Sequence, residues 1–155
     1  MPNIPAEIGC GVVGTIFNQD KHFSPFAKAT PLLMALGEIV SLETEDQMHA
    51  LTAVSGSGPA YVFAMAEALE EAALALGLPD KTARKLSIQT IFGSGNILAQ
   101  GKLSPEELRK LVCSPGGTTE AGLNVLLNKK PSLFELVQDT VKAAEERSIE
   151  LSKKH

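Results

Sequence analysis

The segment VCSPGGTTEAG, residues 112–122, places two consecutive glycines among small hydroxyl side chains, between two stretches that read as helices. Gly116 and Gly117 can adopt backbone conformations in which successive N–H groups converge on one point. The positive end of the following helix lies there too, so the loop is a candidate site for a carboxylate or phosphate. The alternative is an elaborate helix cap in which Thr118 or Thr119 bonds only its own helix.

A second glycine-rich stretch, SGSGPAY at residues 55–61, opens a long apolar helix. One interpretation is a flexible entry loop with Pro59 in the first helical turn, where proline is well tolerated. The two glycines and two serines also fit a closely packed backbone, or the edge of a cofactor resting against it. Composition leaves both interpretations open.

A third stretch, GCGVVG at residues 9–14, matches the dinucleotide-binding pattern G-x-G-x-x-G. That pattern binds a pyrophosphate when a strand precedes the glycines and a helix follows them. Here eight residues precede Gly9, two of them proline, and a strand follows. We therefore interpret this match as chance.

Composition and charge exclude several classes of protein. The formal charge of the 155 residues is −4 and no basic stripe is interleaved with aromatics, which argues against nucleic-acid binding. No window approaches the roughly 20 apolar residues of a membrane span, and the N-terminus lacks the pattern of a signal peptide. Two distant cysteines, Cys10 and Cys113, indicate neither a metal site nor a disulfide framework. We expect a cytoplasmic protein without a membrane anchor.

The first part of the chain predicts a βαβ unit. Residues 11–17 and 38–42 are rich in β-branched side chains and read as buried strands, with a helix from Pro25 to Gly37 between them. Such a crossover makes the strands parallel. Two parallel strands need neighbours on both sides, so this sheet is incomplete on its own.

From Glu45 onward the sequence predicts helices. One ends at Gly77 and Pro79, and the next begins at a predicted Asp80 cap and ends at Gly101. The latter is apolar on several sides and contains mid-helix glycines, so we predict that it is wholly buried, with a second copy of the chain as a candidate partner. Two capping boxes follow, Ser104 with Glu107 and Ser132 with Glu135.

Four segments together resemble one enzyme family: MPNIPAEIGCGVVG, TAVSGSGPAYVFAMAEAL, ARKLSIQTIFGSGNIL and LRKLVCSPGGTTEAGLNVL. They are similar to the Δ1-pyrroline-5-carboxylate reductases, and the resemblance runs from Met1 nearly to Leu151. The family's N-terminal Rossmann domain is largely missing. The resemblance implies a mainly α chain: residues 1–44 as the C-terminal tail of a truncated NAD(P)-binding Rossmann domain, a βαβ remnant, and residues 45–155 as a helical dimerisation and substrate-binding domain of the 6-phosphogluconate dehydrogenase C-terminal type.

The resemblance also implies an activity, the NADPH- or NADH-dependent reduction of the cyclic imine pyrroline-5-carboxylate in L-proline biosynthesis. The implied substrate-binding residues all lie in the glycine-rich loop: Val112, Ser114, Gly116, Gly117, Thr118 and Thr119. Ser114, Gly117 and Thr118 would hold the substrate carboxylate, and Val112 would pack on the ring. Thr119 is implied as the catalytic residue, whose hydroxyl orients the ring nitrogen or relays its proton.

The implied cofactor-binding residues are Met1, Pro2 and Asn3, near the nicotinamide. Because the main cofactor site would lie in the missing half, we expect no cofactor on this chain and no activity from it alone. We expect a homodimer, with assembly beyond the dimer left open, and no metal site. The alternative is a non-catalytic helical homodimerisation module.

Overall fold

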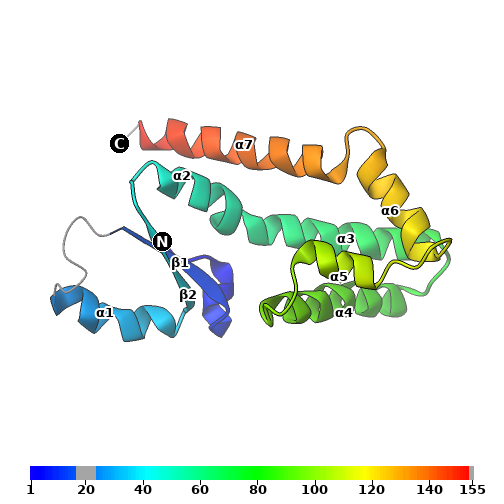
Figure 1. The fold of residues 1–155 in the computed structure, drawn as a ribbon, viewed down its shortest axis with the longest axis horizontal. Coiled ribbons are helices and arrows are strands. Elements are labelled where there is room, and N and C mark those ends of the chain that lie inside the picture. Colours follow the sequence, from blue (N-terminus) through cyan, green and yellow to red (C-terminus); the bar gives the residue numbers. More distant parts are fainter. Residues whose placement is uncertain (17–23, 154–155) are drawn as a thin grey trace. The chain divides into compact units, whose positions relative to one another are not determined.

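The computed structural model describes residues 1–16 and 24–153. The chain divides into two compact units, Met1–Tyr61 with Gln138–His155 and Val62–Val137. The elements, drawn in Figure 1, are η1 (Ile4–Ile8), β1 (Gly11–Ile16), α1 (Ser24–Met34), β2 (Gly37–Leu42), α2 (Gln47–Leu51), η2 (Thr52–Gly56), α3 (Gly58–Ala75), α4 (Asp80–Ala99), α5 (Pro105–Leu111), α6 (Thr118–Asn128) and α7 (Leu133–Ser152). The predicted class, helices preceded by a small parallel sheet, is confirmed.

The first unit contains the predicted βαβ arrangement. Strands β1 and β2 are parallel and paired from Gly11 opposite Gly37 to Ile16 opposite Leu42, with α1 between them in the chain. Phe17, which the sequence added to the first strand, lies outside the described residues. The predicted end of the helix at Gly37 is wrong: α1 ends at Met34, because Gly37 has already turned into β2 with a φ of 137°.

Helix α2 and the turn after it pack on the sheet. Val13 of β1, Leu51 of α2 and Ala53 of η2 are buried together in the first unit. Gly14 makes this possible, because a Cβ at that position would lie 2.5 Å from Cδ1 of Leu51. This packing fixes η2 against the start of β1.

In the second unit, α4 lies alongside α3 (Figure 1). Ala83 and Ser87 of α4 are buried, and the Ser87 hydroxyl donates a hydrogen bond to the carbonyl of Ala66 on α3. The predicted Asp80 cap is wrong: Pro79 is the N-cap residue, in an extended conformation, and Asp80 is the first residue of the helix.

The prediction that α4 is wholly buried is also wrong for this chain by itself. The exposed fractions of Leu86, Ile88 and Phe92 are 50, 52 and 62%. A Cβ added at Gly93 would meet no other atom within 4 Å. Leu86 lies on the opposite side of α4 from Ile88 and Phe92, so the described residues leave large apolar side chains half exposed on more than one side of this helix.

Both predicted capping boxes are confirmed. Glu107 accepts a hydrogen bond from the Ser104 N–H at 2.8 Å, and the Ser104 hydroxyl accepts from the Glu107 N–H. Ser132 and Glu135 repeat the arrangement, with an N–H to carboxylate distance of 2.7 Å. Bonds from the Lys130 ammonium and from Ser132 lower the pKa of Glu135 to about 2.

Candidate functional site

The candidate anion loop joins α5 to α6 (Figure 1). Val112 ends α5, and Gly117 is the N-cap residue of α6. Gly116 has a φ of 70°, in the left-handed region that favours glycine. Gly117 has a different requirement, because a Cβ there would lie 2.6 Å from Oγ of Ser114. The two glycines are therefore needed for two separate geometric reasons.

The expectation that the N–H groups of Gly116 and Gly117 converge on one point is wrong, because each has its own acceptor within the chain. The Gly117 N–H donates to the carbonyl of Ser114 at 3.0 Å. The Gly116 N–H donates to Oε2 of Glu120 at 2.7 Å. Both amides are thus satisfied inside the chain, because the tight bend brings acceptors of its own to them. The roles of Gly116 and Gly117 in substrate binding stay predictions.

The unpartnered hydrogen-bond donors follow the two glycines, in the first turn of α6. Within the described residues, no acceptor bonds the N–H groups of Thr118 and Thr119, and the N-cap residue Gly117 has no side chain to reach them. In the described part of the chain the hydroxyls of Thr118 and Thr119 form no hydrogen bond to α6. The alternative interpretation, a cap in which one of these hydroxyls bonds its own helix, is therefore not what the structure has. Free N–H groups at a helix start carry partial positive charge, so they suit a small anion.

The side chains around these donors differ in exposure. Ser114 and Thr118 are exposed and Thr119 is half-buried. Val112 is 67% exposed, so its isopropyl group is available to an apolar partner. The loop therefore combines an apolar side chain, three hydroxyls and two unpartnered amides, which suits a small molecule with an anionic end and an apolar ring.

The predicted cofactor residues lie in the first unit and are bonded to it. Met1 and Gly14 exchange two backbone hydrogen bonds, of 2.6 Å and 2.9 Å. Oδ1 of Asn3 accepts from the Val12 N–H at 2.8 Å, and Nδ2 donates to the Ser55 carbonyl at 2.9 Å. Both polar atoms of the Asn3 side chain are thus committed, and its cofactor role stays a prediction.

Two sequence motifs take structural roles. The SGSG stretch ends η2 and leads into α3; η2 is a turn of π-helix in which the Ser57 N–H donates to the Thr52 carbonyl at 2.9 Å. In GCGVVG the glycines lead into β1 and not into a helix, as expected for a chance match. Sequence reasoning missed the Asn3–Ser55 bond and the Gly116–Glu120 bond, although a glutamate three residues after an N-cap is a local signal for the second.

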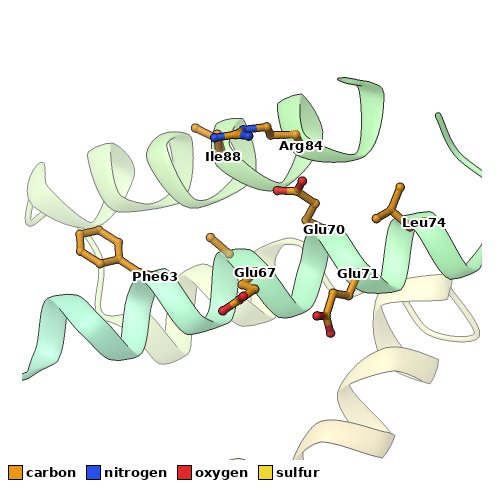
Figure 2. Close-up of a pocket in the computed structure, with 8 residues that line it drawn as sticks. Phe63, Glu67, Glu70, Glu71, Leu74, Arg84 and Ile88 are labelled. Atoms are coloured by element: carbon orange, nitrogen blue, oxygen red, sulfur yellow. The ribbon is translucent and has the colours of Figure 1, made fainter. Parts of the chain in front are cut away.

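A separate groove of about 460 Å³ lies in the second unit (Figure 2). Its lining comes from α3 and α4: Phe63, Ala66, Glu67, Glu70, Glu71, Leu74, Arg84 and Ile88. None of the loop residues contributes to it. Across residues 1–16 and 24–153, no group of three or more His, Cys, Asp or Glu side chains could hold a metal ion. In the same ranges, no helix is long and apolar enough to cross a membrane.

Comparison with known proteins identifies the family to which this chain is similar. Residues 45–151 match the family model described as pyrroline-5-carboxylate reductase dimerisation. Pyrroline-5-carboxylate reductases of Synechocystis sp. and Pseudomonas aeruginosa are each 40% identical, over 99% and 98% of this chain and 57% and 55% of theirs.

Solved structures agree with the sequence comparisons. A pyrroline-5-carboxylate reductase from Coxiella burnetii superposes with a TM-score of 0.90 at 38% identity, covering 97% of this chain and 55% of that one. The Plasmodium falciparum enzyme with NADP bound gives 0.78 at 34%, covering 96% and 59%. The chain spans just over half the length of these relatives. It belongs to the pyrroline-5-carboxylate reductase dimerisation family.

Proposed function

We propose that this chain is the dimerising and substrate-binding part of a pyrroline-5-carboxylate reductase, which reduces a cyclic imine to L-proline. The observation that carries the proposal is the open start of α6. The N–H groups of Thr118 and Thr119 have no partner among the described residues, in a chain about 40% identical to such reductases along nearly all its length.

The substrate carboxylate binds at this helix start. Because the Gly117 amide is already bonded, the donors are the N–H groups of Thr118 and Thr119, with the Ser114 hydroxyl beside them. Hydrogen bonds to an ionised acceptor are stronger than neutral ones, so a few donors suffice. Gly116 contributes the bend that aims the helix start, and the substrate ring packs on Val112.

Reduction requires a hydride at the C=N carbon and a proton on the ring nitrogen. A bound NADPH or NADH supplies the hydride, and protonation of the nitrogen makes the carbon electrophilic. The contribution of this chain is to position the substrate. The hydroxyl of Thr119 orients the nitrogen or relays its proton, while the carboxylate anchored on the same turn sets the ring at a fixed angle.

The cofactor meets this chain at its first three residues. The Asn3 amide is bonded to Val12 and Ser55, and the Met1 sulfur accepts a hydrogen bond from the Thr52 hydroxyl at 3.1 Å. The exposed ring of Pro2 and the exposed part of the Met1 side chain are therefore left to contact the nicotinamide. On this proposal the main cofactor site lies in the part of the reductase that this chain does not span, which the greater length of its relatives supports. The chain alone therefore does not turn over.

A second copy of the chain covers the exposed apolar surface. The side chains it covers are about half exposed or more, including Phe63, Leu86, Ile88, Phe92 and Ile97. Monomeric proteins seldom leave apolar patches of this extent in water. The family match also concerns dimerisation, which supports a homodimer. The second candidate function is a purely non-catalytic dimerisation module, which the same exposed apolar surface favours. The two candidates differ at the start of α6, where only the reductase part binds a ligand.

The proposed domain boundary lies at residues 44–45, where the family match begins. The compact first unit runs on to Tyr61, because the bonds of Asn3 and the packing of Leu51 attach the following turn to the sheet. Both Cys10 and Cys113 are free thiols, which fits our proposal of a reducing, cytoplasmic location.

Titration with L-proline, the proposed product, tests the site. We expect its addition to shift the amide NMR signals of Thr118 and Thr119 in the 155-residue chain. L-Prolinamide is the control, because it keeps the ring and lacks the carboxylate, and it should leave these signals in place. Shifts confined to other residues, or no shift at millimolar proline, would refute the proposed substrate class.

A further inference from the structure

Among the helices of residues 1–16 and 24–153, three carry a glutamate at the third helical position, and one of them uses it differently. At α5 and α7 the N-cap residue is Ser104 or Ser132, and the glutamate bonds the N–H of that same serine. At α6 the N-cap residue is Gly117, whose N–H is bonded to Ser114. Glu120 therefore reaches one residue further back, to the N–H of Gly116 at 2.7 Å.

The difference leaves the start of α6 open. The serine hydroxyls at the other two helices accept from the N–H of Glu107 at 3.2 Å and of Glu135 at 3.4 Å. A glycine at the N-cap position has no such acceptor, so the first amides of α6 stay available. The usual stabilisation of the helix start by its N-cap side chain is lost as well. Only Glu120, among the described residues, links the body of α6 to the bend before it through a side chain.

We propose that Glu120 is a positioning residue that acts through the Gly116 amide. Its carboxylate clamps the left-handed bend onto α6, so that the amides of Thr118 and Thr119 are presented to the substrate carboxylate in a fixed orientation. The inference rests on the proposed function for its ligand, and on the Gly116–Glu120 bond for its mechanism. An uncharged acceptor can hold the same amide through a weaker hydrogen bond, and the negative charge of Glu120 repels the incoming carboxylate.

Two variants of the 155-residue chain separate acceptor from charge. Glu120→Gln keeps an acceptor for the Gly116 N–H and removes the charge, whereas Glu120→Ala removes both. We expect Glu120→Gln to bind L-proline about two- to threefold more tightly than the native chain, the size expected for two nearby carboxylates at a surface. Glu120→Ala should bind at least about threefold more weakly than Glu120→Gln, since the two have the same charge and differ in the hydrogen bond.

A matched pair at the other helix start controls for general effects. Glu135→Gln and Glu135→Ala alter a carboxylate with the same 2.7 Å bond to a backbone N–H, away from the loop. They should change stability and leave the affinity for proline unchanged. The hydrogen exchange of the Gly116 amide provides a second measurement: we expect it to be faster than native in Glu120→Ala and to lie between these two values in Glu120→Gln.

The outcomes are distinguishable. Equal proline affinity in Glu120→Gln and Glu120→Ala, or unchanged exchange of Gly116 in Glu120→Ala, would overturn the positioning role. If the native chain binds no proline, the proposed function fails and the substrate part of this inference fails with it. The exchange of Gly116 would then still decide whether Glu120 holds the bend.

Discussion

The side-chain amide nitrogen of Asn3 lies 2.9 Å from the carbonyl oxygen of Ser55, across 52 residues of sequence. The same side chain accepts the N–H of Val12 at 2.8 Å. Asn3 thereby joins the N-terminal segment, β1 and the π-helical turn η2. Backbone groups of an irregular turn need partners of this kind, because the regular ladder of a helix no longer supplies them.

Replacing Asn3 should destabilise the first unit. We expect Asn3→Ala to lower the free energy of unfolding by about 1–3 kcal/mol, because it leaves the Val12 N–H and the Ser55 carbonyl without partners. Urea titration measures the change. Asn128→Ala is the control, since its bond to Asn124 is exposed on a helix surface and should contribute at most about 0.5 kcal/mol. Equal losses in the two variants would contradict the linking role of Asn3.

Gly37 tests the start of β2. Its φ is 137°, and a Cβ at this position would lie 1.9 Å from the carbonyl oxygen of Gly11 on the paired strand. Gly37→Ala should therefore cost more than about 3 kcal/mol, from backbone strain and a clash that cannot relax without breaking the strand pair. Gly77→Ala also meets a positive φ, of 87°, but in open space, and should cost only about 1 kcal/mol. Calorimetry on both variants measures the difference.

The N-terminal box of α7 gives a pH dependence. The Lys130 ammonium, and then the Ser132 N–H and hydroxyl, hold the pKa of Glu135 at about 2 in the folded chain. A carboxyl whose folded pKa is depressed stabilises the fold above its unfolded pKa of about 4.5, and loses that contribution as the pH falls towards 2. As the pH is lowered from 5 to 2, the unfolding temperature should therefore fall less steeply for Glu135→Gln than for the native chain. Parallel curves would contradict the assignment.

Local patterns predicted the features that depend on neighbours in sequence. The boxes at Ser104 and Ser132 span three residues each, so composition and spacing alone identify them. The Asp80 cap failed by one residue, because Pro79 already has the extended conformation that an N-cap residue needs. The capping-box pattern requires serine or threonine at the N-cap, so it does not predict the hydrogen bond of Glu120, whose helix has Gly117 as its N-cap residue.

Non-local features were beyond such patterns. The bond between Asn3 and Ser55 joins residues that no periodicity relates. The open N–H groups at Thr118 and Thr119 depend on which acceptors the two glycine amides take, and the sequence does not specify those acceptors. The apolar, glycine-containing sequence of α4 indicated burial, but a sequence does not tell whether the covering atoms come from the same chain or from another copy.

The exposed face of α4 predicts the oligomeric state. We expect the native chain to sediment as a dimer at micromolar concentration, and Phe92→Glu to shift it towards monomer. The Phe92 ring is 62% exposed in one chain, and at the proposed interface a carboxylate in its place would be buried at a cost in free energy. Gln100→Glu introduces the same charge at the exposed end of the helix and should leave the dimer intact. A native chain that stays monomeric would contradict the proposed partner.

Thr119 tests the chemistry most directly. In this chain joined to the cofactor-binding region of a longer relative, Thr119→Val should lower kcat about 10- to 100-fold, which is at or below the low end for a proton-transferring group because a hydroxyl is a weak acid. The unfolding temperature should hardly change, since the Thr119 hydroxyl has no bond among the described residues to lose. Thr118→Val keeps its N–H for the carboxylate and loses only an exposed hydroxyl, so its kcat should stay within about threefold of native. Steady-state kinetics with pyrroline-5-carboxylate would separate the two variants, and equal kcat values would remove the proton role from Thr119 while leaving the carboxylate site untouched.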